Sequence, residues 1–350
     1  MTKTEARSAV INSPVGEILE YAVNNILITQ KVTGEIPWAV GEKTDPWDMV
    51  ESIMGLSISG HFEEARKGFL WFRKMQISDG SFYASYKDYK PEDKTKDTNM
   101  SSYVAVGLYH YYLITGDKAF VDKMWPCIKK SIEFVLSLQS EDGGIYWAKS
   151  PEGKVDRMYL LTGSSSIFMS LKAAICLSRI MNESNDLWVE AALKLRDILR
   201  YKRHMFNVSK SRFSMDWFYP VLCGALGMDD SRKRLEKYWK KFIVEGLGAR
   251  CVSDNPWVTI AETCELVLAL YSIGNIEQAK ILYSWILDKR YEDDGSFWCG
   301  FTFPDMVVWP EERLAWTNSV AIMAADALYD ISPASDFFSR KFWESKQIFD

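Results

Sequence analysis

The chain has 350 residues, of which 47% are hydrophobic and 25% are charged, and its formal net charge is -5. This composition is typical of a folded protein with a large core, and its acidic balance argues against a nucleic-acid-binding protein. No stretch approaches the roughly 18 uninterrupted apolar residues that a membrane span needs, and the N-terminus lacks a signal-peptide pattern, so we expect a cytoplasmic protein.

Six segments have the pattern of buried helices. Each begins with acidic, amide or hydroxyl side chains beside aromatic residues and continues with apolar residues on most faces of a helix. In chain order they are TDPWDMVESIMGLSI from Thr44, KDTNMSSYVAVGLYHYYLI from Lys96, DRMYLLTGSSSIFMSLKAAICL from Asp156, SRFSMDWFYPVLCGAL from Ser211, NPWVTIAETCELVLALYSI from Asn255 and WPEERLAWTNSVAIMAADAL from Trp309. A helix that is apolar nearly all round is buried.

A second kind of helix alternates with these. Three stretches, from Gly60, Gly116 and Gly274, run from a glycine through an amphipathic helix into an acidic Asp-Gly turn and an aromatic pair. Self-similarity of this kind identifies a repeated supersecondary unit. Asp-Gly is a turn sequence in its own right, so we interpret the aspartates of the three turns, Asp79, Asp142 and Asp294, as scaffold.

The alternation predicts an all-α protein with the architecture of an (α/α)6 toroid, since no alternating strand pattern is evident. We expect residues 1–350 to form a single domain, with residues 1–43 supplying an outer helix, from Ser13 to Gln30, that closes the ring. A linear solenoid of helical hairpins is the alternative. The six cysteines are scattered without a CxxC motif, which favours buried free thiols.

In such a ring the N-terminal ends of the inner helices converge, so their polar openings would line one pocket. Carboxylates accept hydrogen bonds from hydroxyls and indole faces pack on sugar rings, so the mixture suits a polyhydroxylated ligand. The predicted substrate-binding residues are Asp45, Trp47, Asp48, Asp97, Asn99, Arg157, Asp216, Trp217, Trp257, Glu262, Trp309 and Trp316. Capping is an equal alternative for Asp45, Asp97 and Asp216, and a structural role is an alternative for Glu262.

Glycoside hydrolysis needs two carboxyl groups, one protonated and one ionised. Glu311 and Glu312 are adjacent, so on a helix they would point about 100° apart, and only one is needed as a cap. At least one of them is therefore a candidate for acid–base chemistry. With three scattered histidines a metal site is not expected, and no cofactor is predicted.

The same residues carry a family resemblance. PEERLAWTNSVAIMAADAL resembles the last inner helix of the glucoamylase family, where a glutamate acts as catalytic base, which implies that role for Glu311 or Glu312. The third helical pair of that family carries its general acid just after a tryptophan, but here Trp147 is followed by Ala148. The sugar-holding Arg-Asp pair is also changed, since Trp47 precedes Asp48. The acid would have to come from elsewhere, and Asp156 beside Arg157 is the candidate.

A second resemblance concerns the turns. QISDGSFY from Gln76 and QSEDGGIYW from Gln139 are similar to the QW repeats of squalene cyclases and prenyltransferase-like toroids, which tie outer helices together. The acid motif DxDD and the diphosphate-ionising DDxxD cluster of such enzymes are absent from the sequence.

The sequence thus predicts an enzyme that hydrolyses a glycosidic bond of an oligosaccharide or glycoconjugate by an inverting mechanism, with Glu311 or Glu312 as base and Asp156 as acid. Two alternatives stay open: a terpenoid-cyclase-like or prenyltransferase-like protein acting on an isoprenoid, and a non-catalytic sugar-binding toroid. The expected partner is a small molecule or oligosaccharide, without nucleic acid.

Overall fold

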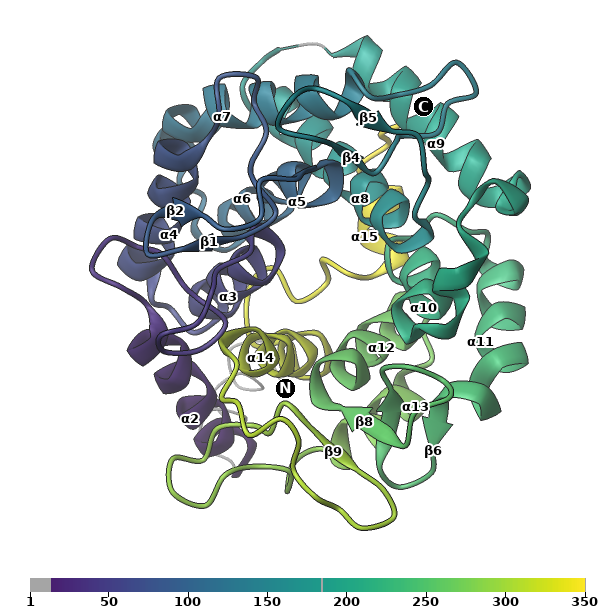
Figure 1. Cartoon of the computed structure of the whole chain (residues 1–350). Helices are drawn as coiled ribbons and strands as arrows, with labels where there is room; N and C mark the ends of the chain where they lie inside the picture. Colours follow the sequence, from purple (N-terminus) through teal and green to yellow (C-terminus); the bar gives the residue numbers. More distant parts are fainter. Residues whose placement is uncertain (1–13, 184, 350) are drawn as a thin grey trace.

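Six largely buried helices form the inner layer of the protein. The computed structural model describes residues 14–183 and 185–349. The inner helices are α3 (Pro46–Ile58), α6 (Val104–Thr115), α8 (Leu161–Ile180), α10 (Ser214–Leu222), α12 (Ile260–Ser272) and α14 (Ala315–Tyr329). Each contacts the next along the chain, and α14 also contacts α3, so the circuit of contacts closes (Figure 1). The predicted all-α class is confirmed in this coarse form.

Six further helices surround this layer. They are α2 (Pro14–Thr29), α4 (Phe62–Met75), α7 (Lys118–Leu136), α9 (Asp186–Tyr201), α11 (Met228–Phe242) and α13 (Ile276–Ser284). Helix α2 packs on α14, and each of the others contacts the inner helix before it in the chain. The predicted helix from Ser13 to Gln30 corresponds to α2, while Ser13 itself lies outside the described residues, as do residues 1–12.

A repeated hydrogen-bonded corner joins successive outer helices. Gln30, Gln76 and Gln139 follow α2, α4 and α7, and each donates from Nε2 to the carbonyl of the glycine four residues later. The same amide donates to a carbonyl of the next outer helix, at 2.9 Å for Glu64, 2.8 Å for Cys127 and 3.0 Å for Ala191. The three turns therefore tie α2 to α4, α4 to α7 and α7 to α9.

The glycines of these corners are required by their surroundings. Gly80 has a φ of +91°, and a Cβ built on it would lie 2.0 Å from the carbonyl oxygen of Lys130 in α7. Gly34 stands in the same relation to Lys67, with a φ of +90° and a distance of 2.1 Å. Only a residue without a side chain fits a left-handed backbone pressed against a helix.

Short strands and helices connect the layers. One antiparallel sheet is the hairpin of β1 (Tyr86–Lys87) and β2 (Lys90–Pro91). A second antiparallel sheet has the strand order β3 (Lys96–Asp97), β4 (Ala148–Lys149), β5 (Val155–Asp156). A third, also antiparallel, has the strand order β6 (Ile243–Val244), β7 (Gly248–Arg250), β8 (Trp257–Thr259), β9 (Gly300–Thr302). The remaining helices are α5 (Thr98–Ser102), α15 (Arg340–Ser345) and the 3-10 turns η1 (Arg203–Met205) and η2 (Val208–Arg212).

Small residues let the inner helices approach closely. A Cβ on Gly55 of α3 would lie 2.3 Å from Oγ of Ser319 in α14, and that hydroxyl donates to the carbonyl of Glu51. All six cysteines are free, and only Cys251 is not fully buried. Among the described helices, α8 alone has the length and composition of a membrane span, and 83% of its most apolar stretch is buried within the protein.

Candidate active site

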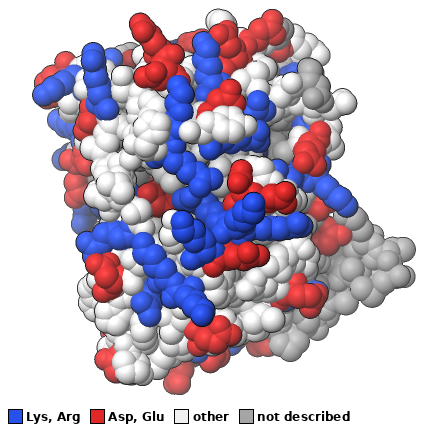
Figure 2. All heavy atoms as spheres, turned by 90° about the vertical axis from the view of Figure 1, so that its right-hand side faces the viewer, with Lys and Arg blue, Asp and Glu red and all other residues white. Residues whose placement is uncertain are grey.

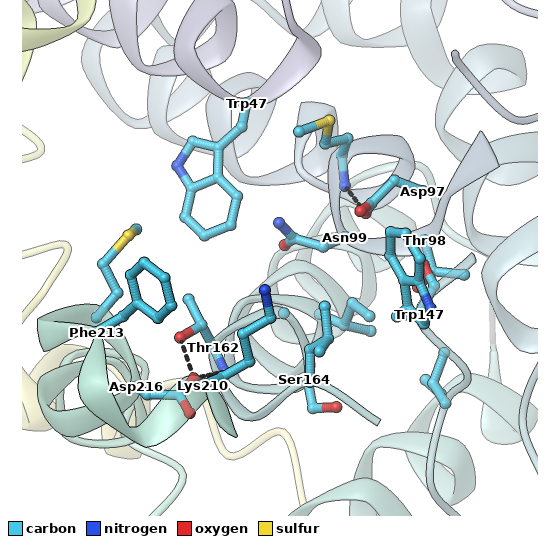
Figure 3. A pocket seen from close by; sticks show the side chains of 16 residues that line it. Trp47, Asp97, Thr98, Asn99, Trp147, Thr162, Ser164, Lys210, Phe213 and Asp216 are labelled. Atoms are coloured by element: carbon cyan, nitrogen blue, oxygen red, sulfur yellow. Dashed lines mark hydrogen bonds between the residues drawn. The ribbon is translucent and has the colours of Figure 1, made fainter. Parts of the chain in front are cut away.

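A cavity of about 270 Å³ opens at the N-terminal ends of α5, α8 and α10. We call it the Trp47 cavity, because Trp47 at the start of α3 forms one of its walls. Figure 3 shows Trp47 and Asp216 on opposite sides, with Asn99 nearby and Lys210 extending into the space between them. Its other lining residues include Met100, Ile145, Trp147, Leu160, Ile167, Phe213 and Met215. The walls are therefore largely apolar, with a few polar groups at defined positions.

Behind Trp47 lies a buried group of carboxyl side chains, the carboxylate cluster, made of Asp45, Asp48, Glu51, Glu262 and Glu265. Glu51 is its most constrained member, because three donors converge on it. Its Oε1 accepts from the Tyr103 hydroxyl at 2.7 Å and from Nε1 of Trp47 at 3.1 Å, and its Oε2 accepts from Nε1 of Trp316 at 2.5 Å. Burial raises the pKa of Glu51 to about 7, and these hydrogen bonds oppose the rise.

Glu265 and Asp48 bind their protons more firmly than Glu51 does. The hydroxyl of Tyr219 donates to Oε1 of Glu265 at 2.6 Å, while Oε2 is buried without a partner. Burial and the charge of Glu51 raise its pKa well above the usual range. Burial also raises the pKa of Asp48 well above its usual range, and the charges of Asp45 and Glu51 add to the effect. Asp48 is the partly exposed member of the carboxylate cluster.

Glu262 lies in the first turn of α12. It is 6% exposed, and it raises the pKa of the nearby Cys251 thiol by its charge and by a hydrogen bond, in addition to the effect of burial. Burial and the charges of Glu262, Glu312 and Asp48 together raise the pKa of Cys299. Carboxylates from the openings of α3, α12 and α14 thus surround one buried thiol.

Asp45, Asp97 and Asp216, for which helix capping and ligand binding are the two predicted roles, all accept backbone hydrogen bonds. Asp45 caps α3 by accepting from the Asp48 N–H at 2.9 Å, and Asp97 caps α5 by accepting from the Met100 N–H at 3.0 Å. Asp216 accepts from the N–H and the hydroxyl of Thr162, the second residue of α8. Asp97 and Asp216 also line the Trp47 cavity, where burial raises the pKa of Asp97 to about 6 and raises that of Asp216. Asp97 and Asp216 therefore accept structural hydrogen bonds and also line the cavity.

The predicted tryptophans have separate surroundings. Trp257 and Trp309 meet edge to face with their ring centroids 5.3 Å apart, and Nε1 of Trp257 donates to the Trp309 carbonyl at 2.7 Å. Trp309 is 58% exposed. Trp217 is turned away from the Trp47 cavity: it stacks on Phe242 at 5.1 Å, and its Nε1 donates to a carbonyl of α11. Trp217 therefore belongs to the packing between α10 and α11.

The three predicted catalytic residues are not brought together at the Trp47 cavity. Glu311 is exposed and, with the half-buried Glu312, lines a second cavity of about 360 Å³ beside α2. Asp156 and Arg157 are both exposed at the end of β5, where Asp156 pairs in register with Ala148. Their catalytic role stays a prediction. Glu312 differs from the other two because its charge raises the pKa of Cys299, as do the charges of Glu262 and Asp48 in the carboxylate cluster.

Sequence reasoning did not identify the hydroxyl donors of the cluster or the apolar cavity wall. Tyr103 and Tyr219 lie four and three residues after the predicted Asn99 and Asp216, about one helical turn further along, which is a signal that helical periodicity could have provided. In the described part of the chain no group of three His, Cys, Asp or Glu side chains is placed to hold a metal ion.

A ring of helices whose openings combine carboxyl groups with indole rings suits a carbohydrate-active enzyme, and similarity to a mannosidase shows that the protein is a glycoside hydrolase. Solved structures share its fold. A glycosidase variant in complex with glucose covers 89% of this chain and 96% of its own, with a TM-score of 0.70 and 13% identity. A GH63 mannosylglycerate hydrolase from Thermus thermophilus covers 87% and 99%, with a TM-score of 0.68 and 11% identity.

A sequence relative defines the family more closely. The chain is 43% identical over 309 residues to the MMP endo-(1,4)-3-O-methyl-alpha-D-mannosidase of Mycolicibacterium hassiacum, and the match covers 88% of this chain and 85% of the relative. The chain belongs to the family of that mannosidase. No family model matches it. The isoprenoid alternative receives no support, because these relatives act on or bind carbohydrates.

Proposed function

We propose that this protein is an endo-acting α-mannosidase that cleaves 1,4-linked polymers of 3-O-methylmannose. The proposal takes its substrate from the mannosidase relative. The observation that carries it is the position of the apolar Trp47 cavity directly beside the carboxylate cluster, since Trp47 lines the cavity and donates to Glu51. The closed circuit of inner helices supports an (α/α)6 toroid rather than an open solenoid, because α14 returns to contact α3.

The cavity wall suits a methylated sugar. Met100, Ile145, Leu160 and Met215 offer thioether and aliphatic surface, whereas an unmodified hexose presents hydroxyls that such a surface would leave unpaired. Asn99 and Lys210 supply polar groups for the hydroxyls that remain, and the buried Oδ1 of Asn99 has no partner in the described part of the chain. One methylene in an apolar pocket is worth about 1–3 kcal/mol, so we expect a preference of at least about tenfold for the methylated substrate.

Asp48 is the general acid of this proposal and Glu262 the general base. The raised pKa of Asp48 keeps its proton available for the departing glycosidic oxygen. Glu262 accepts the proton of the water that attacks the anomeric carbon from the opposite side, so one bond breaks as the other forms and the configuration inverts. The sequence prediction names Glu311 or Glu312 as base, and of these two Glu312 lies near the same thiol as Asp48 and Glu262.

The test compares single variants of the carboxyl groups. Asp48→Asn and Glu262→Gln should each lower the rate on a 3-O-methylmannose oligosaccharide by about 10² to 10⁴. Glu133→Gln, on an exposed position of α7, is the matched control and should keep the wild-type rate. The same assay on Glu311→Gln, Glu312→Gln and Asp156→Asn decides between this assignment and the one predicted from sequence.

Two results would count against the proposal. Full activity of Asp48→Asn or Glu262→Gln would exclude these residues as acid and base. Proton NMR of the first product formed should show the β-anomer released from an α-linkage, and initial release of the α-anomer would show retention instead of inversion.

A further inference from the structure

Another cavity lies at the opposite ends of the inner helices from the Trp47 cavity. It has a volume of about 370 Å³ and lies beside Leu222 and Gly224 at the end of α10 and Ser272 at the end of α12. The segment that contains α15 covers it, with Trp343 and Phe349 among the apolar residues that face it. We call it the basal cavity.

Four cationic side chains line the basal cavity. Three of them donate to carbonyls in the turn after α10: Lys172 Nζ to Cys223 at 2.9 Å, Arg200 Nε to Ala225 at 2.7 Å and an Arg340 terminal nitrogen to Leu226 at 2.7 Å. Cations at a helix C-terminus are favourable, which explains these three bonds. Each of these bonds uses one donor of its group, whereas an ammonium has three N–H donors and a guanidinium has five.

The remaining donors are incompletely satisfied. The Nε atoms of Arg196 and Arg340 are buried and have no hydrogen-bond partner among the described residues. Buried polar atoms without a partner are uncommon in folded proteins, and each one calls for an explanation such as a bound ion. Here two of them belong to guanidinium groups that line the same cavity.

The charges are also unbalanced. Glu344 is the one acidic side chain among the described residues that line the basal cavity, and none of Lys172, Arg200 and Arg340 forms an ion pair in the described part of the chain. Arg196 lies 3.8 Å from its sequence neighbour Asp197, and its guanidinium lies over the Phe349 ring, 5.1 Å from the ring centroid. The cations act on one another, because burial and Arg340 lower the pKa of Lys172 to about 7.

The surface beside the cavity is basic as well. Helix α9, which contributes Arg196 and Arg200, lies with α11 on one side of the ring (Figure 1), and Lys and Arg side chains gather on that face in Figure 2. A surface of one charge raises the local concentration of ions of the opposite charge.

We propose that the basal cavity binds a phosphate monoester of a small organic molecule. Guanidinium groups bind phosphate through paired hydrogen bonds, and Arg196, Arg200 and Arg340 line one cavity together with Lys172. The apolar walls formed by Phe168, Trp343 and Phe349 receive the organic part. The site is separate from the carboxylate cluster and does not depend on the hydrolase proposal.

The experiment titrates the full chain with glycerol phosphate and with inorganic phosphate, and measures binding by isothermal calorimetry and by the melting temperature. Sodium chloride at equal ionic strength is the reference. We expect saturable binding and a rise in melting temperature with the monoester, with inorganic phosphate binding more weakly. Arg196→Gln, on a partly exposed position, and Arg340→Gln should each weaken binding at least tenfold.

Arg232→Gln, at an exposed position of α11 away from the basal cavity, is the matched control and should bind as the wild type does. The melting temperatures of the variants without ligand show whether each one is folded. Absence of any saturable binding by the wild type, or equal binding by wild type, Arg196→Gln and Arg340→Gln, would overturn the proposal.

Discussion

The buried carboxyl of Glu51 makes the stability of the protein depend on pH in a predictable direction. Its pKa is about 7 in the folded protein, against 4.5 for an ordinary glutamate. Because the folded value is the higher one, the native state favours the protonated form. The stabilisation is fully present below about pH 4.5 and is lost as the pH rises through 7.

The size of the effect follows from the two pKa values. One pKa unit corresponds to about 1.4 kcal/mol, so the full loss is about 3 kcal/mol, and about 2.5 kcal/mol of it falls between pH 5 and pH 8. Glu51→Gln removes the titrating group. The free energy of unfolding of the wild type, minus that of the variant, should therefore fall by about that amount over this range. The charge of Glu51 also raises the pKa of Asp48. Its removal in Glu51→Gln lowers that pKa and so adds to the same change in the stability difference with pH.

The assay is urea unfolding at pH 5, 6, 7 and 8, followed by tryptophan fluorescence, for the wild type, Glu51→Gln and the control Glu133→Gln. Loss of hydrogen bonds from Trp47, Tyr103 and Trp316 will lower the stability of Glu51→Gln at every pH, but this offset does not change the slope. A difference between wild type and Glu51→Gln that stays constant from pH 5 to 8 would refute the reasoning.

Two further predictions concern the scaffold and the acid. Gly60 has a φ of +84° and nothing within 4 Å of an added Cβ, so Gly60→Ala should lower the free energy of unfolding in urea by about 1–2 kcal/mol. Gly80→Ala should lower it clearly more, because the Lys130 backbone blocks the added Cβ. Equal losses in the two variants would show that the backbone around Gly80 shifts to make room for the Cβ. Glu51→Gln should also move the alkaline limb of kcat/KM to lower pH, because Asp48 then loses its proton more easily, and a limb unmoved from wild type would argue against Asp48 as the acid.

The sequence predicted the helices well because both helix types have strong patterns. The segments from Thr44 and Asn255 contain α3 and α12, and the stretch from Gly60 contains α4. The segment from Lys96 is divided in the structure into α5 and α6 at Tyr103. The first corner, at Gln30 and Gly34, was not recognised, since VTGEI lacks the Asp-Gly sequence of the later ones.

The strands and the inner cluster were beyond the reach of sequence patterns. Strands β3, β4 and β5 have two residues each, too few for an alternating pattern, yet they place Trp147 beside the Trp47 cavity. The three donors that hold Glu51 come from α3, the junction of α5 and α6, and α14, and the donor in α14 is 265 positions from Glu51 in the chain. Only closure of the ring brings them together, so the sequence could not show which donors would hold Glu51.

The most direct test of the central claim is a crystal structure of Asp48→Asn with a 3-O-methylmannose oligosaccharide. The account predicts a glycosidic oxygen within hydrogen-bonding distance of Asn at position 48, a water on the opposite side of the sugar held by Glu262, and a methyl group in the Trp47 cavity. An oligosaccharide bound instead in the cavity beside α2, with its glycosidic bonds at Glu311 and away from the carboxylate cluster, would contradict it.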